Sequence, residues 1–300
     1  MVMPRIFPAR KGSLDREGAL FDIGVKAALL AWGLVTAYPI WYVIVSSLSS
    51  GSAVDIGAVW WKPIGLNLDS YRHVLAKSQF WVSYGNTFFY TIAGTAYSLM
   101  ISTTAAYALS RRAFRARKVL NLALSFTLWF QAGFIPLYLN FRSLGVINSR
   151  WGIVVSFGVQ AFNIILMRNY FESLPKELDE AAKIDGANEF RVFTDVYLPL
   201  SKPAMTTIAI YYAISRWNGF FWSMVLLKRA DLIPIQVYLQ QMIIQEQISL
   251  ENASLVGGET FSFATLKYAL IVCSIIPVIV GYPFVQRYFQ RGITVGGVKE

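Results

Sequence analysis

Six long apolar stretches dominate this 300-residue sequence and limit what it can fold into. Each is long enough to cross a bilayer as a helix, which takes roughly 20 residues. They cover residues 25–48, 86–110, 119–141, 151–171, 203–227 and 263–289. Only 15% of the residues are charged and the mean hydropathy is +0.47, too apolar for a soluble protein of this length. The sequence therefore predicts an all-α integral membrane protein with six transmembrane helices.

Lysine and arginine are concentrated on one side of the predicted spans. The N-terminal segment, the loops after the second and fourth spans and the C-terminal tail hold 17 of them, against seven in the other loops. Residues 111–118 alone contain five cations and no acid. Because cytoplasmic loops carry such an excess, we predict that both termini are cytoplasmic, with a segment at 1–24, a transmembrane domain at 25–289 and a tail at 290–300. The net charge of +10 thus indicates orientation in the membrane and not nucleic-acid binding.

Side chains suited to catalysis or metal binding are sparse. Cys273 is the only cysteine and His73 the only histidine, which excludes a disulfide framework and a His/Cys metal site. The sequence lacks the Gly-x-x-x-x-Gly-Lys-Ser/Thr loop that cradles nucleotide phosphates, and it shows no nucleophile paired with a base. We therefore expect no catalytic residue, metal or cofactor in this chain, and no enzyme activity of its own.

A polar segment at residues 172–202 separates the fourth and fifth predicted spans. Pro175 suits the first turn of a helix, acids follow it where the helix dipole favours them, and Gly186 can adopt the left-handed conformation that ends a helix. Asn188 is a suitable cap for a second short helix, which Pro199 would stop, with Ser201 as a candidate cap for the next span. The segment predicts two short helices at the cytoplasmic surface.

The first of these helices has a face built partly from small residues. Leu178, Ala181, Ala182 and Asp185 recur at spacings of three and four and so share one face, and the alanines allow another surface to approach closely. One interpretation is a docking site for a cytoplasmic partner. The other is an ordinary pair of interfacial helices.

The spacing within this segment resembles the "EAA loop" of ABC-importer permease subunits, with Val196 where that pattern has Ile. The matching residues are Glu180, Ala181, Ala182, Gly186, Leu198 and Pro199. The stretches "AAKIDGANEFRVFTDVYLPLSKPA", "ISRWNGFFW" and "PIQVYLQQM" resemble the sugar-importing subfamily, the maltose-permease-like second subunits. Within it, "ISRWNGFFW" resembles the fifth-span signature of the subfamily, and "PIQVYLQQM" and the tail "RYFQRGITVGGVKE" are similar to members that handle oligosaccharides or polysaccharides.

The resemblance implies a permease subunit of an ATP-driven saccharide importer in the bacterial inner membrane. The EAA loop would be a coupling helix that docks on a cytoplasmic ATPase subunit, with Asp185 in the docking turn. Implied partners are a second, different permease chain, two ATPase subunits that hold ATP and Mg, and a soluble binding protein. Two other classes stay open: a membrane-embedded glycosyl or lipid transferase, and a scaffold or sensor without transport.

Polar side chains inside the predicted spans are the candidates for a substrate path, because such groups are costly in a bilayer and usually face a cavity. Arg216 could bind the carboxylate of an acidic, alginate-like sugar, or it could pair with an acid of a partner subunit. Aromatic faces beside hydrogen-bonding groups suit a sugar. The candidate path consists of Gln131, Gln160, Asn163, Arg216, Trp217 and Asn218.

Overall fold

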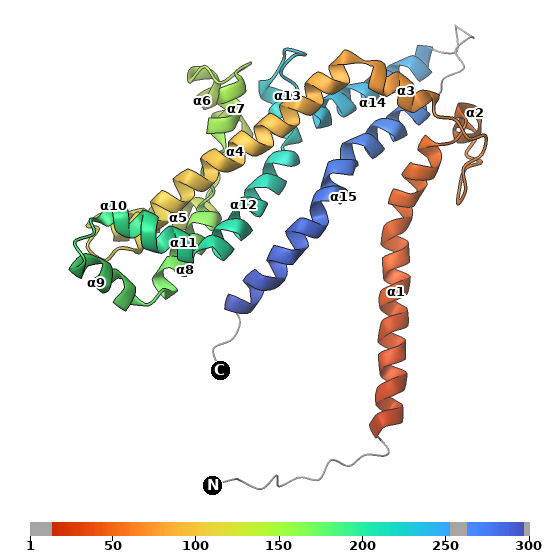
Figure 1. The fold of residues 1–300 in the computed structure, drawn as a ribbon. Helices are drawn as coiled ribbons and strands as arrows, with labels where there is room; N and C mark the ends of the chain where they lie inside the picture. The colour runs from red at the N-terminus through yellow and green to blue at the C-terminus, as the bar shows by residue number, and fades with distance from the viewer. Residues whose placement is uncertain (1–13, 253–262, 297–300) are drawn as a thin grey trace. The chain divides into compact units, whose positions relative to one another are not determined.

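The computed structural model describes residues 14–252 and 263–296, and within them every regular element is a helix (Figure 1). The contacts divide these residues into two units, with boundaries between Arg72 and His73 and between Val272 and Cys273. The all-α part of the prediction is therefore confirmed for the residues that the structure describes.

The first unit consists of α1 (Leu14–Ser47), α2 (Gly51–Asp55) and the first residues of α3 (Asp69–Ala76) and α15 (Phe263–Gly296). Val45, Val54 and Val59 form its small core, with Tyr268 packed against them. The apolar side chains along most of α1 are exposed, Trp32 for example at 71%. An apolar helix without a covering surface is what a lipid environment accommodates.

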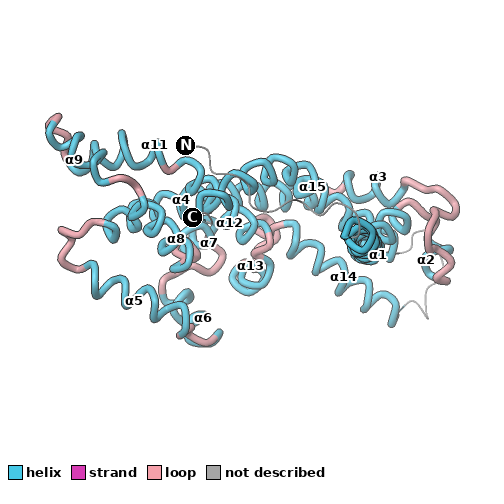
Figure 2. Tube along the Cα trace, turned by 90° about the horizontal axis from the view of Figure 1, so that it is seen from below, coloured by secondary structure: helices cyan, strands magenta, loops and turns pink. Residues whose placement is uncertain are grey.

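The second unit is arranged around α4 (Ser78–Ser110), an unbroken helix of 33 residues. Its most extensive contacts are with α12 (Lys202–Trp217) and α8 (Ala161–Ser173), followed by α7 (Arg150–Ser156) and α14 (Ile235–Asn252), as Figure 2 shows for α7, α8 and α12. The main core of the unit contains Ala106, Tyr107, Leu109, Ile164, Met167, Phe171, Val192, Tyr197, Ile208 and Tyr212.

Three of the stretches predicted as single spans are divided in two. Residues 119–141 form α5 (Arg117–Trp129) and α6 (Phe134–Ser143), and Pro136 lies in the first turn of α6, so it kinks no helix. Residues 151–171 form α7 and α8, which meet at a bend of 53°. Residues 203–227 form α12 and α13 (Phe220–Leu226).

A glycine accompanies each of these breaks. Gly158 lies at the α7–α8 bend, where an added Cβ would be 2.4 Å from Cε1 of Tyr97 on α4. Gly133 and Gly219 are the residues that precede α6 and α13. The chain can therefore leave the helical path at these points, and at Gly158 the bend brings the backbone close to α4.

Two described helical segments are long and apolar enough to cross a membrane, Phe21–Ser47 in α1 and Ala264–Pro283 in α15. The bent pair α7 and α8 also qualifies if it is counted as one span. The prediction of six spans goes beyond these segments and stays a prediction. Helix α1 begins inside the segment predicted at 1–24, and α15 continues into the tail predicted at 290–300.

Candidate functional site

The polar segment between α8 and α12 folds locally as its sequence predicts. Helix α9 (Lys176–Ile184) is followed by Asp185 at the C-cap and then by Gly186, which has φ +80. The N–H of Gly186 donates to the carbonyl of Lys183, and the N–H of Ala187 to that of Ala182, both at 3.0 Å. These two bonds form the Schellman ending, which satisfies carbonyls that the last turn leaves free. Asn188 Oδ1 then accepts from the N–H of Arg191 at 2.9 Å and caps the next helix.

The second helix of this segment is longer than predicted. It runs as α10 (Glu189–Arg191), a π-helical stretch, η1 (Val192–Tyr197), and α11 (Leu198–Leu200) without a break. Pro199 lies at the start of α11, and the helical path ends only after Leu200. The prediction of Ser201 as a side-chain cap is wrong, because its backbone is not extended and its buried hydroxyl has no hydrogen bond among the described residues. We call residues 176–200 the α9–α11 hairpin.

A charged cluster holds the hairpin against the end of α4. Arg111 directly follows α4, and its Nη2 lies 2.7 Å from Oδ1 and 2.9 Å from Oδ2 of Asp179 on α9. Its Nη1 donates to the hydroxyl of Tyr197 at 3.1 Å. The Arg111 and Asp179 side chains are only 16% and 18% exposed, so water screens this pair less than a surface ion pair.

A second acid and a second cation extend the cluster. Glu189 lies 3.1 Å from Nη2 of Arg111 and accepts from the hydroxyl of Tyr107 at 2.8 Å. Lys183 lies within 3.4 Å of Asp179 and 3.1 Å of Glu189. Although partial burial opposes the shift, hydrogen bonds from Tyr107 and Lys183 hold the pKa of Glu189 below its usual value. The hydrogen bond with Glu189 in turn raises the pKa of Lys183.

Only part of the predicted docking face of α9 is exposed. Ala182 is half-buried and packs against the protein's own core, so it is not part of an open face. Leu178 remains 40% exposed, and two large apolar side chains that the sequence reasoning missed, Ile184 and Phe190, are 86% and 72% exposed. Of the other predicted coupling residues, Leu198 is half-buried and the exposed ones are Glu180, Ala181, Asp185, Gly186 and Pro199.

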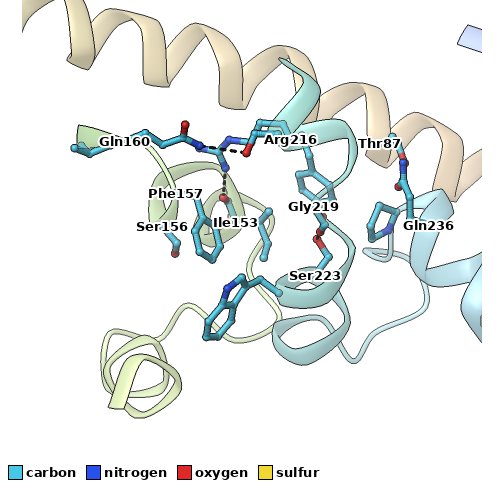
Figure 3. Close-up of a pocket in the computed structure, with 14 residues that line it drawn as sticks. Thr87, Ile153, Ser156, Phe157, Gln160, Arg216, Gly219, Ser223 and Gln236 are labelled. Atoms are coloured by element: carbon cyan, nitrogen blue, oxygen red, sulfur yellow. Dashed lines mark hydrogen bonds between the residues drawn. The ribbon is translucent and has the colours of Figure 1, made fainter. Parts of the chain in front are cut away.

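A pocket of about 210 Å³ lies between α4, the α7–α8 bend, the α12–α13 break and the start of α14 (Figure 3). Polar residues of α4 position its wall, because Thr87 Oγ1 accepts from the N–H of Ile235 at 2.8 Å and Tyr90 donates to the carbonyl of Leu232. The polar side chains that line the pocket are Thr87, Ser156, Gln160, Ser215, Arg216, Ser223 and Gln236, and the aromatic ones are Tyr90, Phe157 and Trp222.

Arg216 binds the end of α7. Its Nη1 donates to the carbonyl of Ile153 at 2.8 Å, and its Nη2 donates to the carbonyl of Val154 at 2.9 Å and to Ser98 Oγ of α4 at 3.1 Å. These carbonyls belong to the last turn of a helix, where no intrahelical donor follows. Gly94 makes room for the arginine, since an added Cβ there would be 2.9 Å from Nε. Arg216 therefore holds the broken fourth stretch against α4 and α12.

Gln160 and Asn163 lie together beside this pocket. Asn163 Nδ2 donates to Gln160 Oε1 at 3.1 Å, and Gln160 Nε2 donates to Ser215 Oγ at 3.2 Å. Asn163 is 1% exposed and does not line the pocket, whereas Gln160 does. Of this pair only Gln160 therefore faces the pocket, and its amide is already hydrogen-bonded to Asn163 and Ser215.

The remaining predicted path residues lie outside the pocket. Trp217 packs edge-on against Phe88, with ring centroids 5.5 Å apart, Asn218 ends α12, and Gln131 lies in the break between α5 and α6. The structure thus brings together Gln160 and Arg216 and adds residues that the sequence reasoning missed. The stretches "ISRWNGFFW" and "PIQVYLQQM" already contained three of them: Ser215, Trp222 and Gln236.

An apolar helical chain with a polar pocket among its helices and an exposed, charged hairpin has the features of a membrane component of a transport system. The chain belongs to the family of binding-protein-dependent transport system inner membrane components, whose family model matches residues 88–295.

Two curated relatives come from Bacillus subtilis (strain 168). The polygalacturonan/rhamnogalacturonan transport system permease protein YtcP is 36% identical over 284 residues, which cover 94% of this chain and 99% of the relative. Protein LplC is 33% identical over 284 residues, which cover 95% of this chain and 96% of that protein.

Two solved structures are similar to this chain. One chain of a bacterial ABC transporter involved in the import of the acidic polysaccharide alginate is 44% identical, with a TM-score of 0.85 and coverage of 95% of this chain and 100% of that chain. A chain of a bacterial alginate ABC transporter in complex with its pentasaccharide-bound periplasmic protein is 14% identical with a TM-score of 0.59, which shows the fold alone.

Proposed function

We propose that this chain is the permease subunit of an ABC importer that moves oligosaccharides or polysaccharides, alginate-like acidic ones in particular, across the inner membrane. The observation that carries this proposal is the 44% identity to a chain of the alginate importer over 95% of this chain. The relative YtcP, named for polygalacturonan and rhamnogalacturonan transport, supports the wider class of polysaccharides.

The geometry of the pocket is compatible with a saccharide. Gln160, Gln236 and Ser223 line the same pocket as the aromatic Trp222, and sugars offer both hydroxyls and apolar C–H faces to such walls. Arg216 contributes a positive charge at the wall, although its hydrogen bonds go to backbone carbonyls and to Ser98. That charge favours an anionic sugar without a direct contact being required.

We place the hairpin in the cytoplasm and count six spans, with α5–α6, α7–α8 and α12–α13 each forming one broken span. The basic segment 111–118 supports this orientation, because Arg111 touches Asp179 and so the basic segment and the hairpin lie at the same end of α4. Thr87 at the pocket is 24 residues from Arg111 along α4, which corresponds to ~36 Å, enough to cross the hydrocarbon core of ~30 Å.

In this proposal the exposed side of α9 docks on a cytoplasmic ATPase subunit. The residues that would form the contact are Glu180, Ala181, Asp185 and Gly186 with the exposed Ile184 and Phe190. ATP and Mg would be held by two ATPase subunits, a second permease chain would complete the membrane part, and a soluble binding protein would deliver the saccharide. Both termini would then be cytoplasmic.

The test is ATP hydrolysis by the assembled importer in liposomes, with binding protein loaded from a panel of acidic and neutral oligosaccharides. We expect alginate oligosaccharides to stimulate hydrolysis and to enter the liposomes, and Glu180→Ala to reduce that stimulation. Stimulation by neutral saccharides alone would refute the acidic substrate. Absence of stimulation by any saccharide, with the complex intact, would refute the proposed function.

A further inference from the structure

Arg111 joins the α9–α11 hairpin to α4 through contacts with both helical parts of the hairpin. It binds Asp179 of α9 through Nη2 at 2.7 Å, and it reaches Tyr197 of η1 through Nη1 at 3.1 Å. Glu189, at the start of α10, lies 3.1 Å from the same guanidinium. A planar, five-donor group is the side chain that can hold several acceptors in one geometry.

The neighbouring cations do not share this arrangement. Arg112, Arg115 and Lys118 are exposed and, within the described residues, have no ion pair with the hairpin. Arg117 pairs with Glu172 on α8, so it connects α5 to a different helix. Among the described cations of residues 111–118, the contact with α9 is therefore specific to Arg111.

A second residue of α4 reinforces the contact. Tyr107 lies one turn before Arg111, and its hydroxyl donates to Glu189 Oε2 at 2.8 Å. Its ring packs at 5.1 Å from that of Tyr197. The last turn of α4 is therefore fixed to the hairpin by both an ionic and an aromatic contact, and the two would move together.

The same helix reaches the pocket. Ser98 of α4 accepts from Arg216 at 3.1 Å, and Gly94 lies against the same arginine. Ser98 and Arg111 are 13 residues apart, ~20 Å along a continuous helix. The stretches 119–141, 151–171 and 203–227 are broken, whereas α4 is unbroken from Ser98 to Ser110. A displacement at the end of α4 can therefore reach Arg216 through Ser98.

We infer that Arg111 is a positioning residue that, through its ion pair with Asp179, transmits movement of α9 along α4 to the helices around the pocket. This inference rests on the proposed function, since it presupposes that α9 is moved by an ATPase subunit. The docking contact lies on the exposed side of α9, whereas the Arg111 pair lies on its inner side, so the two can be separated by mutation.

The experiment compares Arg111→Gln, Asp179→Asn and the double variant in the assembled importer in liposomes. Saccharide imported per ATP hydrolysed is measured, together with copurification of the ATPase subunits. We expect each single change to lower import per ATP about tenfold, within the range that contacting residue pairs contribute, and the double change to add little more. Retained ATPase subunits would show that the docking face is intact.

Matched controls make the outcome specific. Arg117→Gln breaks a comparable ion pair with Glu172 and should leave import per ATP unchanged, as should Arg115→Gln on the exposed loop. Arg111→Lys keeps the charge and should recover part of the ratio. Tyr107→Phe, which removes a single hydroxyl, should produce a smaller loss and provides the test if the charge variants do not fold.

Three results would overturn the inference: an unchanged ratio in the single variants, effects that multiply in the double variant, or loss of the ATPase subunits from the complex. A wild-type complex whose hydrolysis no saccharide stimulates would instead refute the proposed function, and the inference with it.

Discussion

Replacing Arg216 with methionine should destabilise the helical core whether or not a saccharide is present. Arg216→Met keeps a side chain of similar length but removes the donors to the carbonyls of Ile153 and Val154, whose residues are only 5% and 1% exposed. A buried acceptor without a partner costs ~1–3 kcal/mol, which gives ~2–6 kcal/mol for two. Water from the adjoining pocket can satisfy part of this need, so we expect ~2–4 kcal/mol.

Thermal unfolding of the purified importer in detergent, followed by tryptophan fluorescence, measures this loss. At roughly 2–4 °C per kcal/mol for a chain of this size, the expected fall in Tm is about 5–15 °C. Gly94→Ala should act in the same direction, because the new Cβ would displace Arg216. Arg229→Gln breaks the exposed pair with Asp231 and should cost less than about 1 kcal/mol. An unchanged Tm in Arg216→Met with loss of saccharide import would refute the structural role and indicate a direct contact with substrate.

Three further predictions concern the α9–α11 hairpin. Gly186→Ala should destabilise the hairpin by ~1–2 kcal/mol through its positive φ, and Gly186→Asn by less, as measured by hydrogen exchange of α9; equal effects would contradict the backbone argument. Asn188→Ala should cost ~1 kcal/mol by removing the cap to Arg191, seen as faster exchange in α10, and unchanged exchange there would argue against that cap. Glu189 is held below its usual pKa of 4.5, so its contribution to stability is complete above that value and is lost as the pH falls through the lowered pKa. Tm should accordingly fall less steeply with acidification in Glu189→Gln than in the wild type, and identical pH profiles would exclude this role.

The local features of the hairpin could be predicted because they depend on neighbouring residues. A left-handed glycine and an asparagine cap are determined within four or five positions, so Gly186 and Asn188 were recognisable from the sequence. The failure of Ser201 as a side-chain cap could not be predicted in this way, because its role depends on whether the preceding helix stops or turns directly into α12. Local pattern alone leaves that choice open.

The interruption of the third stretch near Gly133 and Pro136 is visible in the sequence, whereas the α7–α8 bend and the partners of the two arginines are not. At the bend Gly158 lies close to Tyr97 of α4, and Arg216 is 63 positions from the carbonyl of Ile153 that it binds. Such contacts are set by how helices pack, and apolar periodicity does not encode them. The sequence groups Arg111 with its basic neighbours, and its contact with Asp179 is visible only in the structure.

A cysteine cross-link from the exposed side of α9 tests most directly whether this helix docks on an ATPase subunit. Cys273 is buried, so Ala181→Cys adds an accessible thiol to a chain whose native thiol is shielded. We predict that in inside-out vesicles a thiol-to-amine cross-linker joins position 181 to an ATPase subunit and abolishes saccharide-stimulated hydrolysis. Leu144→Cys, exposed in the loop after α6, should give no such product. Labelling of position 181 from the outside of intact cells would contradict the cytoplasmic location of the hairpin. Absence of a cross-link between position 181 and an ATPase subunit would contradict its role in transport.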